Sequence, residues 1–396
     1  MRLTLLACLC FLFCEAVSAG AVTPMDAELL EGRLNDIRCE YSVTRPEAAL
    51  MGSYDRFEDP AAAPPKGTCF YQLYIPPGYN RNAEWKYPVM FIASAKGAPI
   101  TDNVEARARR DGWILVLLMD SVEGDPLWLA NFLGAHDDVV KRVRALPDFK
   151  VATGSKAGGD FASTYAAYRS GFKGYIGQSS CFWSDRQGHR YDAARMNKEL
   201  AVYQVLGTPH PSFRCRAAIK SGLPKDTFHA VECVDIGDAW ARSDAMERAL
   251  DWLEKTVFLD ARLIKFSQDT LSWHYRNKLI ALEKAQSPFE KYELMEYLAA
   301  FAKKHNLVSR KEIRETTQGF EKELQTLARD DPVKKELAAR MQFLVISQMD
   351  NRYLANDAKA HQVASAHEAL AKQYEDTVYG KKAAVRAASL RIEFRF

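Results

Sequence analysis

The sequence predicts a doubly wound α/β domain with a mostly parallel sheet, followed by an all-helical C-terminal domain. Between residues 67 and 256, short apolar runs alternate with segments of helical periodicity, which is the pattern of strands joined by crossover helices. Beyond residue 257 the strand signals stop and apolar residues recur at helical spacing. With 396 residues, 47% hydrophobic and 27% charged, the chain has globular composition and sufficient length for two domains.

The N-terminal segment has the features of a secretory signal peptide. Arg2 precedes an apolar run over residues 3–14, and small residues from 16 to 21 offer cleavage sites after Ala19 or Ala21. The run is too short to cross a bilayer as a helix. We therefore expect an exported protein, secreted or periplasmic, that lacks residues 1–21 and does not associate with the membrane. An N-terminal core helix is the alternative interpretation.

Composition also bears on partners and cofactors. A formal net charge of +3 gives no electrostatic reason to expect nucleic acid or an anionic membrane as partner. No Cys-x-x-Cys motif or spaced histidine pair accompanies the cysteines that remain after signal cleavage, so we expect no zinc site. No other cofactor is expected.

Five cysteines follow the predicted signal peptide: Cys39, Cys69, Cys181, Cys215 and Cys233. In an oxidising space such residues form lasting disulfides, and an odd number leaves at least one outside any internal pair. Pairing of Cys39 with Cys69 would staple the N-terminal extension to the first strand. Cys181, Cys215 or Cys233 could instead pair within the sheet region, and the sequence leaves the connectivity open.

The predicted elements follow in order along the chain. Residues 22–66 form an N-terminal extension, with a short amphipathic helix around residues 29–37 and a proline-rich connector at 59–67. The sheet domain, residues 67–256, begins with an alternating strand and ends with a helix at 243–253. The other predicted strands and helices are strands 69–75, 87–93, 112–119, one starting at 147, 173–178, 201–207 and 228–234, and helices 102–110, 129–146 and 161–168.

The C-terminal domain, residues 257–396, is predicted to consist of helices. Short connectors such as residues 286–288 and 330–332 place proline near helix starts. Residues 366–390 resemble one tetratricopeptide-like hairpin joined by residues 374–377, without a fixed period in the rest of the domain. A plain helical bundle fits the pattern as well, and either arrangement is a candidate surface for a protein partner.

Residues 150–160 read as a strand, a sharp turn and the start of a helix. Glycines flank the turn in the pattern Gly154-x-Lys156-x-Gly158. The nucleophile turn of α/β-hydrolases reads Gly-x-Ser-x-Gly. The central position here holds lysine, and Ser155 falls one residue earlier, so the turn motif is complete except for its hydroxyl.

Several further stretches accompany this motif in a fitting order, and together they cover about half the chain. They are residues 71–79, 87–89, 112–113, 152–159, 237–240 and 249–253. The set resembles exported α/β-hydrolases of the polyhydroxybutyrate depolymerase and feruloyl esterase type. The resemblance implies an α/β-hydrolase fold in which a serine attacks an ester carbonyl, a histidine takes its proton, an acid orients the histidine, and backbone N–H groups stabilise the oxyanion.

Each triad position departs from this pattern. The resemblance puts the nucleophile at Lys156, the acid at Pro209 or His210, and the base at Asp238. A protonated ammonium has no lone pair, and three departures in matching contexts argue against triad chemistry. We therefore expect a degenerate triad, in which Lys156 and Asp238 form an ion pair where serine and histidine normally meet.

The candidate ligand-binding residues are Lys96, Ala157 and Trp183. Lys96 lies in loop 94–97, where a His-Gly-Gly type sequence is common in the family, and together with Lys156 it would attract an anion. Trp128, Phe182 and Trp183 follow strands, at the edge where ligands gather in open α/β sheets. These aromatic residues would stack on a sugar or an aromatic ester, or else pack in the core.

The sequence leaves three functions open. The favoured one is a catalytically degenerate hydrolase fold that binds a small ligand or serves as a scaffold. The second is a serine carboxylic-ester hydrolase that uses Ser155 after a one-residue register shift, with a non-standard base such as His274. The third is a partner-binding protein that acts through residues 257–396.

Overall fold

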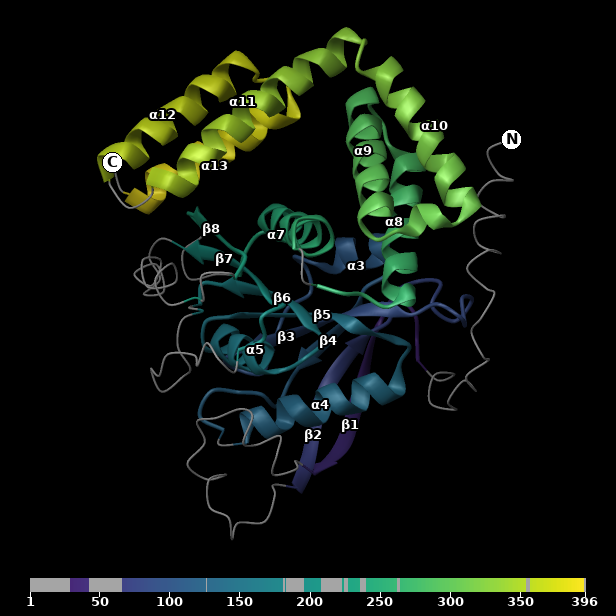
Figure 1. Ribbon diagram of the computed structural model, residues 1–396. Helices are drawn as coiled ribbons and strands as arrows, with labels where there is room; N and C mark the ends of the chain where they lie inside the picture. Colours follow the sequence, from purple (N-terminus) through teal and green to yellow (C-terminus); the bar gives the residue numbers. More distant parts are fainter. Residues whose placement is uncertain are drawn as a thin grey trace. The chain divides into compact units, whose positions relative to one another are not determined.

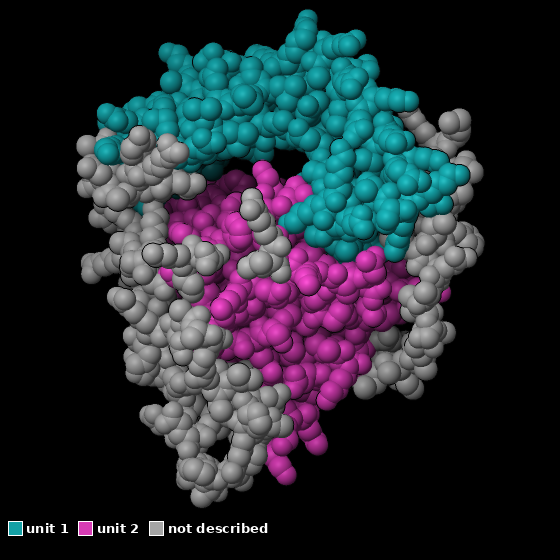
Figure 2. All heavy atoms as spheres, in the orientation of Figure 1, with its two compact units in different colours: residues 1–21, 271–396 teal, residues 22–270 magenta. Residues whose placement is uncertain are grey.

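The computed structural model describes residues 29–42, 66–125, 127–180, 182, 196–207, 223, 227–235, 240–261, 264–353 and 357–394 (Figure 1). The predicted signal peptide and most of the proline-rich connector lie outside these residues. Contacts divide the described residues into a first unit within Val22–Thr270 and a second unit within Leu271–Phe396 (Figure 2). None of the described helices combines the length and the apolar character that a membrane span requires.

The first unit is built on an eight-stranded sheet with the order β1-β2-β4-β3-β5-β6-β7-β8. The β1–β2 and β2–β4 pairs are antiparallel and all the others are parallel. This confirms the predicted doubly wound, mostly parallel sheet, and every predicted strand is present with its ends displaced by a few residues. The strands are β1 Leu34–Ser42, β2 Lys66–Tyr74, β3 Tyr87–Ser94, β4 Ile114–Leu118, β5 Ala145–Ser155, β6 Phe172–Gln178, β7 Ala201–Gly207 and β8 His229–Val234.

Helices cover both faces of this sheet. Figure 1 shows α4 and α5 on one face and α3 and α7 on the other. Every residue of β3, β4, β6 and β7 is buried, as expected for strands covered on both faces. The helices of this unit are α3 Glu105–Asp111, α4 Trp128–Arg142, α5 Ala157–Tyr168 and α7 Ser243–Lys255, which continues as a π-helical turn over Thr256–Asp260.

Aromatic rings join α4, α5 and the sheet into one core. Phe91 of β3 contacts Phe132 of α4 and Phe172 of β6, with ring centroids 5.6 and 5.7 Å apart. Phe132 stacks in turn on Tyr165 of α5 at 3.9 Å with an interplanar angle of 10°. Offset stacked and tilted rings add about 0.5–1.5 kcal/mol per pair beyond area burial. The core therefore fixes α5, and with it the turn that precedes α5.

A buried arginine joins α3 to α7 on the opposite face. The guanidinium of Arg107 contacts Glu247 at 2.8 Å, Asp251 at 2.7 Å and Glu254 at 2.9 Å, and it also pairs with Asp111 in its own helix. Burial works against the charged guanidinium, but the carboxylates outweigh it and hold the pKa of Arg107 well above its usual value. Arg107 therefore stays charged, and its removal would leave the buried carboxylate of Glu254 without this counter-charge.

The predicted amphipathic helix around residues 29–37 is wrong. Residues 34–42 form β1, which pairs with β2 from Leu34 opposite Tyr74 to Ser42 opposite Lys66. The side-chain amide of Asn35 donates to the Leu73 carbonyl at 3.0 Å. Pairing with the edge of β2 satisfies the backbone of this segment, and that tertiary interaction overrides an apolar spacing that also suits a helix.

The second unit is helical, as predicted. Its helices, the first of which begins just before the unit, are α8 Gln268–Lys284, α9 Pro288–Lys304, α10 Lys311–Leu327, α11 Asp331–Tyr353, α12 Asp357–Gln373 and α13 Val378–Phe394. The predicted connector at residues 286–288 caps α9, because the Ser287 hydroxyl accepts from the Glu290 N–H at 3.1 Å. Helices α12 and α13 pack together across the predicted junction at 374–377. The tetratricopeptide-like character of this hairpin stays a prediction.

Candidate functional site

A single residue, Lys156, joins β5 to α5. Its backbone has φ 55° and ψ −130°, a conformation that non-glycine residues rarely adopt and that costs about 1–3 kcal/mol. The Lys156 N–H donates to the Gln178 carbonyl at 3.2 Å, and the Lys156 carbonyl accepts from the Asp160 N–H at 3.2 Å. Lys156 is half-buried. It therefore stands at the sharp strand-to-helix turn that carries the nucleophile in α/β-hydrolases.

Ser155 lies inside the sheet. It is the last residue of β5, where it pairs with Ser94 of β3 and Gln178 of β6, and only 5% of its surface is exposed. A one-residue register shift would turn every side chain of β5 to the opposite face of the sheet. The register of the structure leaves Ser155 in the strand and Lys156 at the turn.

The flanking glycines are required by close backbone contacts. A Cβ atom on Gly154 would lie 2.6 Å from the carbonyl of Gly158 and 2.8 Å from that of Ala93. A Cβ atom on Gly158 would lie 2.5 Å from Cα of Ser94. Strands β3 and β5 and the start of α5 thus meet backbone to backbone, and this packing needs glycine whatever side chain the turn presents.

Three predicted site residues lie at one edge of the sheet. Because β3 and β5 are parallel neighbours with Ser94 opposite Ser155, the loop after β3 and the turn after β5 leave the sheet together. Lys96 lies in that loop with its side chain exposed, and its N–H donates to the Ser94 hydroxyl at 3.4 Å. Ala157 opens α5, whose first N–H groups have no partner inside the helix. Two lysines and a helix N-terminus therefore occupy this edge.

A buried polar network, absent from the sequence prediction, lies beside the turn. The side-chain oxygen of Gln178 accepts from the Asn103 side chain at 2.9 Å and from the Ala241 N–H at 3.0 Å. The Gln178 amide nitrogen donates to the Thr153 hydroxyl at 2.9 Å, and Asn103 also donates to the Ala241 carbonyl at 2.8 Å. The network fixes the chain just after the predicted base position. The one sequence feature that could have indicated this network is Gln178, a polar residue at the end of the predicted strand 173–178.

The structure does not test the other predicted site residues at this edge. His210, Asp238 and Trp183 lie outside the described residues, so the pairing of Lys156 with Asp238 stays a prediction. His274 lies in α8, where its Nε2 atom is 2.7 Å from the hydroxyl of Tyr297 in the second unit.

Trp128 and Phe182 belong to the core. Trp128 is buried and stacks on Phe161 with ring centroids 4.3 Å apart. Phe182 is also buried and its ring lies 5.1 Å from that of Tyr175. These two side chains are therefore packing residues, which corrects the alternative that placed them on a ligand-stacking surface.

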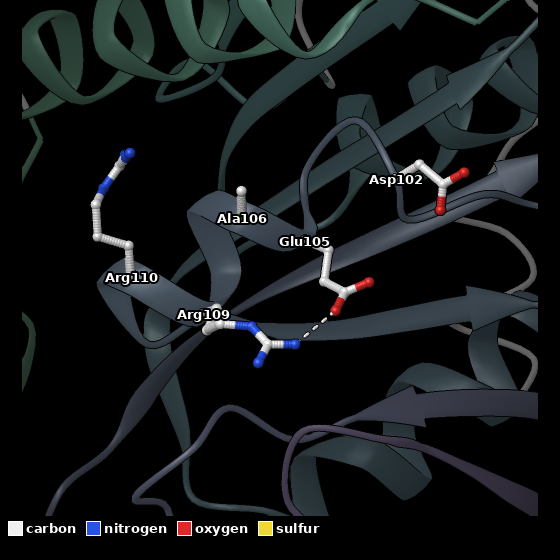
Figure 3. Close-up of a pocket in the computed structure, with 5 residues that line it drawn as sticks. All are labelled: Asp102, Glu105, Ala106, Arg109 and Arg110. Atoms are coloured by element: carbon white, nitrogen blue, oxygen red, sulfur yellow. Dashed lines mark hydrogen bonds and ion pairs between the residues drawn. The ribbon is translucent and has the colours of Figure 1, made fainter.

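A separate surface pocket of about 550 Å³ lies along α3. Among the described residues it is lined by Asp102, Glu105, Ala106, Arg109 and Arg110 (Figure 3). Figure 3 shows the ion pair between Glu105 and Arg109, at 2.9 Å, with Arg110 directed away from it. Lys96, Ser155, Lys156 and Ala157 are not among the described residues that line this pocket. The described residues also contain no group of three histidine, cysteine or acidic side chains placed to hold a metal ion.

Strand order and turn geometry together define the architecture. The mixed eight-stranded sheet has a strained turn between β5 and the helix that follows it. In α/β-hydrolases, a turn of this kind at the top of the sheet carries the nucleophile. The fold is that of an α/β-hydrolase. No family model and no curated protein sequence matches the chain.

Solved structures with a similar fold include several hydrolases. An IroE-like serine hydrolase from Shewanella oneidensis has 13% identity and a TM-score of 0.40, and the match covers 75% of this chain and 100% of that one. A dienelactone hydrolase-like promiscuous phosphotriesterase from metagenomic libraries has 16% identity and a TM-score of 0.37, covering 63% and 98%. A Bacillus cereus carboxylesterase has 13% identity and a TM-score of 0.36, covering 47% and 93%.

The contact between Gly158 and β3 generates a prediction. We expect Gly158→Ala to lower the free energy of unfolding by about 1–3 kcal/mol, because the new methyl group meets backbone that must move. Helix propensity alone predicts the opposite sign, since alanine is favoured over glycine by about 1 kcal/mol. Urea unfolding followed by circular dichroism measures the change.

Gly319→Ala in α10 is the matched control. Apart from its chain neighbours and the backbone of α10 itself, no described atom lies within 4 Å of a Cβ built at Gly319, so alanine should stabilise α10 by about 0.5–1 kcal/mol. Stabilisation by both substitutions would show that the β3–β5–α5 contact does not require glycine at position 158.

Proposed function

We propose that this protein is a catalytically inactive member of the α/β-hydrolase fold that binds a small ligand without hydrolysing it. The proposed site is the edge of the sheet that holds Lys96, Lys156 and Ala157, which we call the Lys156 edge. The observation that carries the proposal is the lysine at the strained turn between β5 and α5. A protonated ammonium cannot attack an ester carbonyl. The motif resemblance to exported polyhydroxybutyrate depolymerases and feruloyl esterases supports descent from an ester hydrolase, and the N-terminal segment supports export.

The ligand we propose is a small molecule with a carboxylate or ester group, attached to a sugar or an aromatic ring. Lys156 and Lys96 supply positive charge at one edge of the sheet. The N-terminus of α5 adds backbone N–H donors and the positive end of the helix dipole. An oxyanion that forms transiently in a hydrolase would here be replaced by a stable anion.

The alternative of a serine carboxylic-ester hydrolase depends on Ser155. The position of Ser155 inside β5, with 5% of its surface exposed and strands on both sides, counts against this residue as a nucleophile. The Nε2 atom of His274, the base in this alternative, lies within hydrogen-bonding distance of the Tyr297 hydroxyl. Both observations support the proposal of a catalytically inactive protein over the alternative of an active serine hydrolase.

A fluorophosphonate probe, which reacts covalently with an activated serine, tests whether the protein has a serine nucleophile. The parent protein should show no covalent labelling and no hydrolysis of short aryl esters above background. The variant Lys156→Ser, Asp238→His, His210→Asp should gain hydrolysis of about 10²-fold over the parent, because a positioned general base contributes on that order. Mass spectrometry locates the labelled residue.

Ser155→Ala in the parent and in this triple variant is the control. Labelling of the parent that disappears with Ser155→Ala would overturn the inactive assignment and support the hydrolase. Labelling of the triple variant that persists with Ser155→Ala would assign the restored nucleophile to position 156.

Anion binding is tested with benzoate as a simple aromatic carboxylate. Calorimetric titration should show saturable binding to the parent that Lys156→Met weakens by about 10-fold or more, because a hydrogen bond to a charged group contributes about 1.5–3 kcal/mol. Lys141→Met, which removes an exposed charge from α4, should leave the affinity unchanged. Equal affinities for the parent and Lys156→Met would contradict a ligand site at Lys156.

A second candidate function, partner binding through residues 257–396, is favoured by one feature of α11. Met341, Leu344, Val345 and Met349 are exposed, and their spacing puts them on one face of this helix. Soluble monomers rarely expose large contiguous apolar patches. The face would suit self-association with a second copy of the chain.

Sedimentation velocity tests this second candidate. If the α11 face associates, the parent should shift from monomer to dimer with rising concentration, and Met341→Glu, Val345→Glu should remain monomeric. Val378→Glu, at an exposed apolar position in α13, serves as the control and should behave as the parent. Monomeric behaviour of the parent at all concentrations would remove self-association from the candidate functions.

A further inference from the structure

The edge strand β1 contacts the core through three side chains, those of Ile37, Cys39 and Tyr41. Of its nine residues, Cys39 is the one whose side chain is buried, and the remainder are exposed or half-buried. Among the described strands, β1 pairs with β2 alone. Ile37 and Tyr41 are half-buried and pack against the core, and the Tyr41 hydroxyl donates to the side-chain oxygen of Asn131 at 2.9 Å. Cys39 is the most buried of the side chains that join β1 to the core.

Cys39 meets a second cysteine across the ladder. The register places Cys39 directly opposite Cys69 of β2, and both side chains are buried. Their Sγ atoms are 2.9 Å apart. Directly opposite residues in an antiparallel pair have Cα atoms about 4.5–5.5 Å apart, which falls within the range of about 4.4–6.8 Å found for disulfides. The backbone thus already has the spacing that a disulfide needs.

The two thiols also differ in acidity. The hydrogen bond from Cys69 lowers the pKa of Cys39, an effect that burial opposes and nearby Arg142 reinforces. The same hydrogen bond and burial raise the pKa of Cys69. Cys39 is therefore the thiol that ionises first, and the thiolate is the form that attacks a disulfide.

We infer that Cys39 and Cys69 form a disulfide that fastens the edge strand β1 to the sheet. The Cys39 thiolate attacks one sulfur of a small-molecule disulfide such as oxidised glutathione, forming a mixed disulfide and releasing one thiolate. Cys69 then loses its proton to solvent and attacks the Cys39 sulfur, which releases the second small thiol. Two protein thiols are oxidised while one disulfide is reduced to two thiols, so atoms and electrons balance.

The link closes a loop over a sequence separation of 30 residues. Such a bond restricts the unfolded chain more than the folded one, so it stabilises the sheet with no new contact in the native structure. This inference does not depend on the ligand or the catalytic state of the Lys156 edge. Cys233 lies in β8, at the opposite end of the strand order, and provides an internal comparison.

Peptide mapping of the full-length protein tests the bond directly. Protein incubated with oxidised glutathione is alkylated under denaturing conditions, digested without reductant and analysed by mass spectrometry. We expect a cross-linked peptide pair containing Cys39 and Cys69, which separates on reduction. Recovery of both cysteines in alkylated form, or of either one joined to another cysteine, would overturn the inference.

Stability gives a second measurement. Reductant should lower the Tm of the parent by about 7–14 °C, as expected for closure of a loop of this size. Cys233→Ser should keep this response, whereas Cys39→Ser, Cys69→Ser should lose it. A response that persists in the double variant would assign the effect to other cysteines and contradict the inference.

Hydrogen exchange on the parent provides a readout that needs no variant. If the double variant fails to fold, reduction of the parent should still accelerate amide exchange in β1 more than in the central strand β5. Equal exchange in β1 before and after reduction, with a Cys39–Cys69 peptide present beforehand, would show that the bond does not hold the strand.

Discussion

The close backbone contact between β3, β5 and the start of α5 is the constraint on which the rest of the first unit depends. Gly154 and Gly158 have no room for a Cβ atom, because each faces the backbone of a neighbouring element. The contact sets the turn at Lys156 and the direction in which α5 leaves the sheet. The aromatic stack of Phe132 on Tyr165 then seats α4 against α5. A side chain at either glycine would have to separate these layers.

The requirement for glycine at positions 154 and 158 does not depend on the reaction that hydrolases catalyse at this turn. Packing requires the glycines on both sides of the turn, whereas Lys156 between them is half-buried and has room for a side chain. Lys156 has a strained backbone conformation at this turn, and in the function that we propose its ammonium takes the place of a nucleophile. The fold is therefore retained by backbone geometry, and the function that we propose follows from the chemistry of one side chain.

Two further interactions hold the surroundings of the turn. Gln178 ties β6 to Thr153, to Asn103 and to the backbone of Ala241, so the chain that enters α7 is fixed near the carboxyl edge of the sheet. Buried Arg107 joins α3 to α7 through the half-buried Glu247 and the buried Glu254. Both are polar interactions in low-dielectric surroundings, where satisfied groups rigidify the structure and unsatisfied ones are costly.

The sequence by itself determined the parallel strands, the helix after the turn and the helical second unit, because hydrophobic periodicity and glycine spacing are local properties. It also placed Lys96, Lys156 and Ala157 at strand ends. Only the tertiary structure decided that residues 34–42 form an edge strand, since the partner that satisfies their backbone, β2, is distant in sequence. The same applies to Ser155 within β5, to the Gln178 network and to the choice of Cys69 as the neighbour of Cys39, because each depends on which strands lie side by side.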